Sequence, residues 1–466
     1  MKEIFVYNNL TRKKEKLIPI NPPTLNIYTC GPTVYDDSHI GHARSAVTWD
    51  FITRFLRYSG YKVNWARNIT DIDDKIINKS KELNTLPNKV ARKYLYSFYE
   101  DMNALGVEWP DYEPQATQYL PQMFSFIDEL LKKEFAYIVD NDIYFSVTTF
   151  KDYGKLKGQN ISDLEKGYGR IELNEKKRNN LDFALWKSVA ENEYGFDSQW
   201  GKGKPGWHLE CSTMNFCLFG TKLDIHGGGD DLIFPHHENE IAQSEAYTGK
   251  LFAKYWLHNG MILINEKKMA KSEGNYITIK DSLKNTTSNT IRLFILNSHY
   301  KMPLNYTSEA ITAAENGVKR LGEALTDTEY TNGKLNSLNN IDENIINDFN
   351  QAMNNDFNSP QALSVLFNIA DMINIEKNKT HKTKYQSTLL LLTNILGFNF
   401  LSPDYNNYFL KEKSFNKIIE LLINWRNESR IVKDFKISDK IRDLLNDCNI
   451  QVKDLKDGKF KWQFKI

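Results

Sequence analysis

Residues 30–42 constrain the fold more than any other stretch and read CGPTVYDDSHIGH. The preceding residues 25–29 (LNIYT) predict a short strand that the Gly-Pro pair ends, and residues 36–38 offer side chains that could cap a following helix. His39 and His42 are three residues apart, so both rings project from one face at the helix N-terminus. Unpaired amides and the positive end of the helix dipole favour an anion such as phosphate there. The alternative is a pair of polar residues that cap a surface helix.

The residues after this stretch complete a strand, helix, strand unit. Apolar residues between 43 and 56 recur at helical spacing, Gly60 ends the helix, and residues 63–66 predict a second strand. Such a unit builds a parallel sheet, so residues 25–67 predict the first half of a Rossmann-like nucleotide fold. Thr70 follows the second strand, where open α/β sheets bind ligands, and is a candidate substrate contact. A helix cap is the alternative role for Thr70.

Composition limits the class of protein. The chain of 466 residues is 41% hydrophobic, which is enough for about three domains. Lys and Arg total 60 and Asp and Glu total 59, so a nucleic-acid partner has to be bound by local patches. The first residues contain no apolar run long enough for a signal peptide, and no run approaches a membrane span. We therefore expect a cytoplasmic protein without a membrane partner.

The four cysteines are too few and too scattered for a disulfide framework, which favours reduced thiols and metal ligation. Cys30 and Cys211 are candidate ligands together with His236 and Glu240, which a helix would present to one point because they are four residues apart. Only an assembled nucleotide fold could bring these four together, at the seam between its halves. A purely structural zinc site is the alternative. The two other cysteines, at positions 217 and 448, are expected to be small core residues.

Two further segments suggest a nucleotide site. Gly227, Gly228 and Gly229 follow a predicted strand, so the backbone could approach a ligand closely, and Asp231 could accept from ribose hydroxyls. A flexible glycine loop is the alternative. Lys268 and Lys271 are predicted to lie in a loop that could close over a triphosphate and neutralise charge as pyrophosphate leaves. A solvated lysine loop is the alternative there.

The sequence between and beyond these segments predicts the remaining architecture. Residues 87–135 are mostly helical in pattern, and a hairpin around Asp140-Asn141-Asp142 follows. This region is predicted to be an insertion between the two halves of the nucleotide fold. Residues from about 305 to 436 predict a helical bundle, and residues 451–464 predict a small hairpin.

The motifs together resemble a known family. HIGH at residues 39–42 and KMAKS at residues 268–272 resemble the paired signatures of class I aminoacyl-tRNA synthetases. The segments CGPTVYD, NITDIDDK, GWHLECS and GGGDDLIFPHHENE are similar to cysteinyl-tRNA synthetases in particular. The resemblance is dense from residue 27 to residue 275 and returns at residues 438–443. One departure is Ala270 in place of the usual serine, and it removes a hydroxyl from the loop.

The resemblance implies a set of roles for these residues. The metal ligands would be Cys30, Cys211, His236 and Glu240, binding one zinc ion per chain that receives the substrate cysteine as its thiolate. The catalytic residues would be His39, His42, Lys268 and Lys271, with the histidines at the α-phosphate and the lysines at the β- and γ-phosphates. ATP would contact His39, His42, Gly227, Gly228, Gly229, Asp231 and Lys271, and the amino acid would contact Cys30, Gly31, Thr70 and Trp207.

The implied activity is that of a cysteine–tRNA ligase. Mg-ATP and L-cysteine would give cysteinyl-adenylate, and the cysteine would then pass to the 3′-terminal ribose of tRNA(Cys). Three other classes are conceivable: a ligase that joins cysteine to a small amine, a zinc hydrolase, and a non-catalytic RNA-binding relative. The helical bundle argues against the first, the HIGH and KMAKS pair against the second, and the intact signature residues against the third.

The expected fold is α/β: a Rossmann-like catalytic domain with an insertion, an α-helical bundle, and a small mixed α/β C-terminal domain. The predicted division is catalytic first half 1–114, insertion 115–200, catalytic second half 201–304, tRNA-binding bundle 305–408, and anticodon-recognition domain 409–466. Residues 411–466 hold 14 Lys/Arg and 9 Asp/Glu, and they include aromatic residues that could stack on unpaired bases. The alternative for this tail is a solvated helix and hairpin. We expect the chain to be a monomer.

Overall fold

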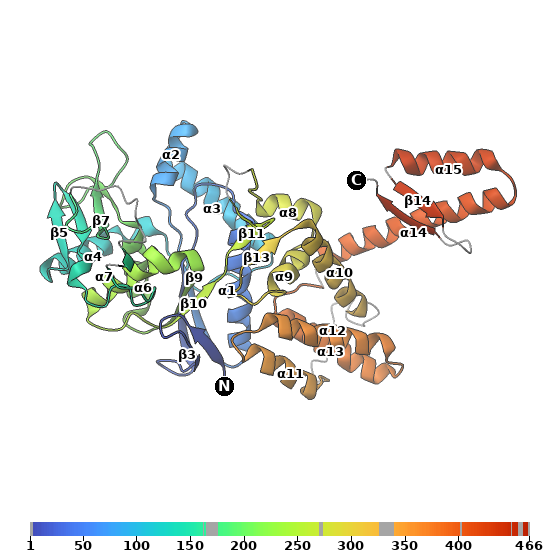
Figure 1. Ribbon diagram of the computed structural model, residues 1–466, viewed down its shortest axis with the longest axis horizontal. Helices are drawn as coiled ribbons and strands as arrows, with labels where there is room; N and C mark the ends of the chain where they lie inside the picture. The colour runs from blue at the N-terminus through green and yellow to red at the C-terminus, as the bar shows by residue number, and fades with distance from the viewer. Residues whose placement is uncertain are drawn as a thin grey trace. The chain divides into compact units, whose positions relative to one another are not determined.

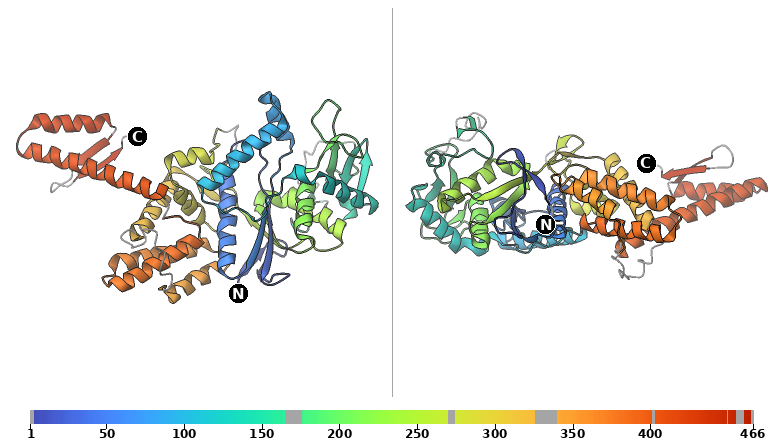
Figure 2. Two further views of the ribbon diagram at one scale, coloured as in Figure 1. Left: turned by 180° about the vertical axis from the view of Figure 1, so that it is seen from behind. Right: turned by 90° about the horizontal axis from the view of Figure 1, so that it is seen from below.

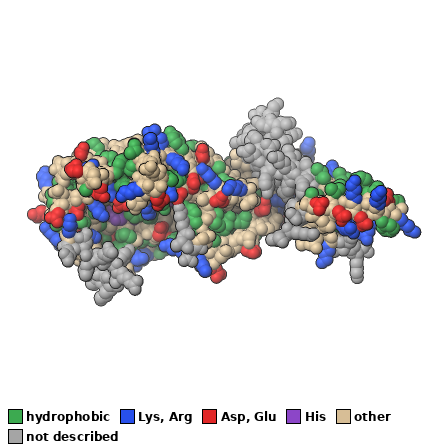
Figure 3. Space-filling model, turned by 90° about the horizontal axis from the view of Figure 1, so that it is seen from above, with side chains coloured by type: hydrophobic (Ala, Val, Ile, Leu, Met, Phe, Trp, Pro, Cys, Tyr) green, Lys and Arg blue, Asp and Glu red, His purple; other side chains and the backbone are tan. Residues whose placement is uncertain are grey.

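The computed structural model describes residues 3–161, 163–164, 176–269, 274–325, 340–400, 403–448, 450–454 and 460–464 (Figure 1). The chain forms two compact units, Met1–Asn399 and Phe400–Ile466. Among the described residues, no helix combines the length and the apolar composition needed to cross a membrane. Positive and negative side chains are interspersed over the surface shown in Figure 3, consistent with the almost balanced charge of the sequence.

The first unit is built around a four-stranded parallel sheet. Its strands are β3 (Thr24–Thr29), β4 (Lys62–Arg67), β9 (Leu223–Gly229) and β10 (Ala253–Asn259), in the order β10-β9-β3-β4. In sequence, helix α1 (Ile40–Tyr58) links β3 to β4, and α7 (Glu238–Thr248) lies between β9 and β10. The strand order therefore reverses between β3 and β9, where the two halves meet, and open α/β sheets bind ligands at such a point. The predicted Rossmann-like class is confirmed.

Helices cover both faces of this sheet (Figures 1 and 2). Helix α1 packs closely on one face, and a Cβ atom at Gly227 would lie 1.8 Å from the ring of Trp49. On the other face, α4 (Leu120–Lys132), α6 (Trp207–Phe219) and α7 share one apolar core with the strands. Large side chains such as Trp256 and Met214 fill that core. The apolar stripes of the sequence thus fix the sheet between two helical layers.

An antiparallel sheet is inserted in the sequence between the two halves of the parallel sheet. It consists of β5 (Ala136–Val139), β6 (Asp142–Phe145), β7 (Phe183–Ser188) and β8 (Gly203–Pro205), in that order, after helices α2 (Asp74–Glu82) and α3 (Pro87–Ala104). The predicted hairpin is present, since Asp140 and Asn141 adopt positive φ angles of 50° and 69° between β5 and β6. The predicted bounds of the insertion stay a prediction.

The remaining elements follow β10. A small sheet of order β12-β11-β13 is formed by β11 (Ile262–Ile264), β12 (Lys267–Lys268) and β13 (Leu304–Tyr306). The helices are α8 (Ile279–Asn285), α9 (Ser288–Leu296), α10 (Ser308–Leu325), α11 (Glu343–Met353), α12 (Ser359–Ile375) and α13 (Lys379–Ile395). Helices α10 to α13 confirm the predicted helical region after residue 305. An N-terminal hairpin of β1 (Phe5–Asn8) and β2 (Lys13–Lys16) completes this unit.

The second unit contains α14 (Pro403–Ile431), α15 (Phe435–Asp447), β14 (Ile450–Asp454) and β15 (Phe460–Phe464). Its small core contains Ile419, Ile423, Ile441, Leu445 and Ile450. The predicted hairpin is present as the antiparallel pair of β14 and β15. A small mixed α/β tail is therefore confirmed.

The structure corrects four local expectations. The three glycines lie inside strand β9 rather than in a loop after it, and Lys268 lies in strand β12. Helix α7 begins at Glu238, so His236 lies in the preceding kinked turn, Ile233–His237, which contains Pro235. Cys217 and Cys448 are exposed rather than buried, because each lies on the outward side or end of a helix whose opposite side is packed.

Candidate active site

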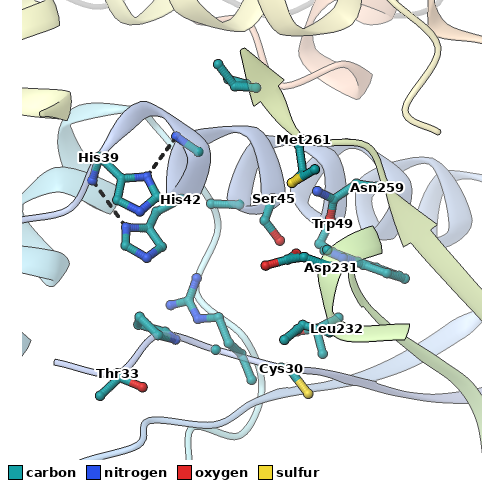
Figure 4. Close-up of a pocket in the computed structure, with 18 of the residues that line it drawn as sticks. Cys30, Thr33, His39, His42, Ser45, Trp49, Asp231, Leu232, Asn259 and Met261 are labelled. Carbon is teal, nitrogen blue, oxygen red and sulfur yellow. Dashed lines mark hydrogen bonds between the residues drawn. The ribbon is translucent and has the colours of Figure 1, made fainter. Parts of the chain in front are cut away.

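A cleft of about 510 Å³ lies where the four parallel strands end. The last residue of each strand lines it: Thr29 of β3, Arg67 of β4, Gly229 of β9 and Asn259 of β10. Figure 4 shows the two imidazole rings side by side at the start of α1, with Ser45 and Trp49 further along that helix and Asp231 and Asn259 near them. The cleft therefore occupies the position that the strand order predicts for a ligand.

His39 and His42 cap helix α1 with their own rings. The Nδ1 atom of His39 accepts from the amide of Gly41 at 3.1 Å, and the Nδ1 atom of His42 accepts from the amide of His39 at 3.2 Å. The predicted cap from residues 36–38 is wrong, because His39 occupies the N-cap position. Since each Nδ1 is an acceptor, a neutral ring must carry its proton on Nε2. The two rings, stacked with centroids 3.8 Å apart, thus each retain one N–H donor.

Both rings are neutral near pH 7. Burial lowers the pKa of His39 to about 4, and burial together with the neighbouring His39 lowers the pKa of His42 well below its ordinary value. Neutral N–H donors can bond phosphate oxygens without the desolvation penalty of a buried cation. The pair is therefore suited to stabilise charge that develops on an anion in the cleft.

Four predicted metal ligands lie together beside the cleft. One donor atom from each of Cys30, Cys211, His236 and Glu240 lies within 4.8 Å of the others. The two sulfur atoms are 3.9 Å apart, and His236 Nε2 is 3.0 Å from Glu240 Oε1. Two sulfurs at zinc–sulfur bond length in a tetrahedral site would lie about 3.8 Å apart. The donor types and their spacing thus fit a tetrahedral metal site.

Proton sharing within the cluster favours anionic ligands. Burial raises the pKa of Cys30 well above its ordinary value, whereas the hydrogen bond from Cys30 outweighs burial and lowers the pKa of Cys211 to about 6. Burial acts against the charged form of Glu240, but His226 and His236 outweigh it and lower the pKa of Glu240 to about 2. Metal ions bind the deprotonated forms of these groups, so two of the four ligands are already in the binding form near neutral pH.

Buried histidines around this cluster were missed by the sequence reasoning. Glu240 Oε2 is 2.9 Å from His226 Nε2, Cys30 Sγ is 3.3 Å from His237 Nε2, and the other ring nitrogen of His237 is 2.8 Å from His258 Nε2. A second group of possible ligands, Cys30, His226, His237 and Glu240, overlaps the first. The only signal in the sequence was the doublet of histidines at 236 and 237. Hydrogen bonds from such partners orient metal ligands.

Of the predicted amino-acid contacts, Gly31 and Trp207 line the cleft, whereas Thr70 does not. Gly31 lines the cleft, donates from its amide to Asn68 Oδ1 at 2.9 Å, and has no room for a side chain, because a Cβ would lie 1.7 Å from the Asn68 carbonyl oxygen. Trp207, which is 40% exposed, also lines the cleft, and the centroid of its ring is 4.1 Å from the centroid of the His236 ring. Thr70 is buried and donates to Glu210 at 3.0 Å. The helix-cap alternative for Thr70 is wrong, because Asp73 caps α2.

Some of the predicted nucleotide contacts line the cleft, and others are explained by packing. Gly229 and Asp231 line the cleft. Gly227 is required for the packing of Trp49, and a Cβ at Gly228 would lie 3.0 Å from the His237 ring. The lining residues Ser45, Asn259 and Met261 were not predicted, because no local motif marks them. Close packing between sheet and helices thus accounts for two of the three glycines.

The lysine loop is described only in part. Lys268 is exposed and lines the cleft. Lys271 and Ala270 lie outside the described residues, so the predicted role of Lys271 stays a prediction.

Comparison with known proteins identifies the class. Residues 16–316 match the family model described as tRNA synthetases class I (C) catalytic domain, and residues 348–401 match the DALR domain. The solved structure of Mycobacterium tuberculosis methionyl-tRNA synthetase in complex with methionyl-adenylate aligns with a TM-score of 0.56 at 13% identity, covering 80% of this chain and 89% of that chain. A putative arginyl tRNA synthetase from Campylobacter jejuni aligns with a TM-score of 0.52 at 14% identity, covering 81% and 92%. The chain has the fold and the catalytic domain of a class I aminoacyl-tRNA synthetase.

Relatives of higher identity define the family more narrowly. A cysteine–tRNA ligase of Bacillus pumilus is 42% identical, with 98% of each chain covered, and one of Clostridioides difficile is 41% identical, covering 98% of this chain and 99% of the relative. The chain belongs to the cysteine–tRNA ligase family.

Proposed function

We propose that this protein activates L-cysteine with Mg-ATP to cysteinyl-adenylate and transfers the cysteine to the 3′-terminal ribose of tRNA(Cys), releasing AMP and diphosphate. One observation supports this most strongly. Cys30 belongs to the metal-ligand cluster and also lines the cleft that contains His39 and His42. A site for a thiol side chain and a site for a phosphate are thus adjacent.

The residues of the cleft have separate roles in adenylate formation. The cysteine carboxylate attacks the α-phosphate, and the Nε2 donors of His39 and His42 stabilise the negative charge that increases there. Lys268 and Lys271 neutralise the β- and γ-phosphates as diphosphate leaves. Gly229 and Asp231 contact adenosine, and Gly31, Thr70 and Trp207 shape the amino-acid pocket, Thr70 through its bond to Glu210.

The metal is proposed to be zinc, bound by Cys30, Cys211, His236 and Glu240. When bound there, zinc would supply a Lewis acid that binds the soft thiolate of cysteine in preference to the hydroxyl of serine. A pocket that recognises shape alone separates substrates differing by one small group only about 10²-fold. The buried side chains of His226, His237 and His258 orient the ligands, and the Trp207 ring packs beside His236 and limits the pocket there.

The helices after residue 305 and the C-terminal unit are proposed to bind the tRNA. Residues 411–466 contain 14 Lys/Arg against 9 Asp/Glu, and Trp425 of α14 is 53% exposed. Cationic side chains contact phosphates, and exposed aromatic rings stack on unpaired bases. We further propose that the protein works as a monomer in the cytoplasm.

The first experiment is cysteine-dependent ATP–pyrophosphate exchange, with serine in place of cysteine as the control and metal content measured on the same sample. We expect exchange with cysteine to exceed that with serine by at least about 10³-fold, at about one zinc per chain. Charging of tRNA(Cys) on the same preparation tests the second step. Exchange without charging would favour the ligase acting on a small amine. Bound zinc without exchange would favour a structural metal and a non-catalytic RNA-binding protein.

A further inference from the structure

The turn before helix α1 is bonded to the segment that follows the lysine loop. The amide of Ile40 donates to the carbonyl of Ile277 at 3.0 Å, and the amide of Ile279 donates to the carbonyl of Ser38 at 2.9 Å. His39 and Thr278 form an antiparallel bridge between these two bonds. The C-terminal end of the lysine loop is therefore attached to the same turn that places the His39 ring.

A polar cluster extends this attachment to helix α3. Ser97 of α3, 7% exposed, donates to Asp37 Oδ1 at 2.5 Å and accepts from the ammonium of Lys280 at 2.8 Å. Lys280 is also 3.7 Å from Asp37 Oδ1 and 3.3 Å from Glu100 Oε2. Lys280 lies in the first turn of α8, directly after the bonded segment. It thus connects three elements that are far apart in the sequence.

Asp101 of α3 is a buried carboxylate that interacts with the turn. The backbone amide of Ser38 stabilises the charged form of its carboxylate, and the residue is 1% exposed. Its Oδ2 atom has no hydrogen-bond partner among the residues that the structure describes. A buried carboxylate with a free oxygen is costly, and Lys280 is the cation that opposes this cost. A neutral hydrogen-bond acceptor would satisfy the Ser38 amide at a lower cost, so packing alone does not explain the charge.

We propose that Asp101 and Lys280 are positioning residues that couple the His39 turn to the C-terminal end of the lysine loop. Neither lines the cleft. Lys280 fixes one end of the loop through Ser97 and Asp37, while the other end continues from β12, which pairs with β11. Moving the turn shifts the His39 ring and residues 277–279 together, and a misplacement of about 1 Å can cost about 10²-fold in rate. The proposal rests on the proposed function, because it assigns these residues to adenylate formation.

The test compares K280M, D101N and the double variant with K284M in cysteine-dependent ATP–pyrophosphate exchange. Lys284 is the matched control, since it lies on the same helix, is exposed, and pairs with Asp281 on that helix. We expect kcat/KM for ATP to fall about 10- to 10²-fold in K280M and D101N, with KM for cysteine and zinc content unchanged. The double variant should lose less than the product of the single losses. K284M should remain within about twofold of wild type.

Hydrogen exchange provides a readout that does not need activity. The amides of residues 38–41 and 277–279 should exchange about 10-fold faster in K280M than in wild type, and at the wild-type rate in K284M. Wild-type exchange rates and wild-type kinetics in both K280M and D101N would overturn the proposal. If the wild-type protein shows no cysteine-dependent activity, the proposed function fails, and amide exchange still decides whether the coupling exists.

The pH dependence of stability separates the charge of Asp101 from its hydrogen bond. Burial raises the pKa of Asp101 to about 6, with Asp37 and Glu100 adding to the rise and Lys280 opposing it. A raised pKa means that folding favours the protonated carboxyl, so this stabilisation is complete below about pH 4 and is lost as the pH rises through 6. D101N keeps an acceptor for Ser38 and removes the titration. The Tm of wild type minus that of D101N should therefore increase as the pH falls from 7.5 to 5, and a constant difference would contradict the assigned charge.

Discussion

The C211S variant is expected to lose bound metal and cysteine-dependent ATP–pyrophosphate exchange together. Cys211 is the cluster residue whose thiol ionises most easily, with a pKa of about 6, because Cys30 donates a hydrogen bond to it. A serine hydroxyl does not ionise near neutral pH and is a harder ligand for zinc. We expect zinc content to fall below about 0.1 per chain and exchange to fall by at least about 10³-fold.

The same helix provides a matched control for this experiment. Cys217 lies six residues further along α6 and is exposed, so C217S should keep wild-type zinc content and exchange. The Tm of C211S should equal that of wild type stripped of metal by a chelator. Full exchange by C211S without zinc would remove the metal from the mechanism, and normal zinc content in C211S would reject Cys211 as a ligand.

The second large effect is expected at His42. Its Nδ1 atom accepts from the His39 amide, and only its Nε2 proton remains to bond an anion in the cleft. H42A removes both interactions, whereas H42N keeps a short acceptor for the His39 amide and lacks the donor at the position of Nε2. We expect both variants to lower kcat of ATP–pyrophosphate exchange by about 10²- to 10³-fold, with zinc content unchanged. H42A alone should lose about 1 kcal/mol of stability, as expected for a lost cap.

Stability and rate measured together distinguish a role of His42 in the reaction from a role in capping helix α1. H42N with the stability of wild type and a strongly reduced kcat would assign the Nε2 donor to the reaction. H42N with a wild-type kcat would limit His42 to a capping role, the alternative that its sequence position left open. His381, an exposed residue on α13, is the control position, and H381A should match wild type in both measurements.

The sequence predicted the elements whose information is local. The alternation of strand, helix and strand between residues 25 and 67, the hairpin around residue 140, and the helices after residue 305 all have short-range patterns. The predicted metal ligands come from distant segments, the end of β3, α6 and the turn before α7, so only their residue types and the four-residue spacing of His236 and Glu240 suggested them. The resemblance to a family implied the same set, and the structure places the four donors together.

Several predictions were wrong because packing decided the outcome. The glycine sequence is typical of a ligand loop, but Gly227 is a strand residue that makes room for Trp49 of α1. The acids at 36 and 37 are typical helix caps, but the ring of His39 takes that position once the turn is bonded to the segment after the lysine loop. The helix-cap alternative for Thr70 was wrong because Asp73 caps α2 and the Thr70 hydroxyl bonds a carboxylate 140 residues later. The predicted contact of Thr70 with the substrate stays a prediction.

The sequence by itself determined the class of the fold, the two signature segments and the chemical types of the site residues, because hydrophobic periodicity and turn residues act over a few positions. Only the tertiary structure decided which buried histidines surround the metal ligands, and which charged side chains link the turn before α1 to α3 and α8. These depend on distances between residues that are tens to hundreds of positions apart. Such distances are set when the two halves of the sheet meet and their helices pack, and no single segment of the sequence contains them.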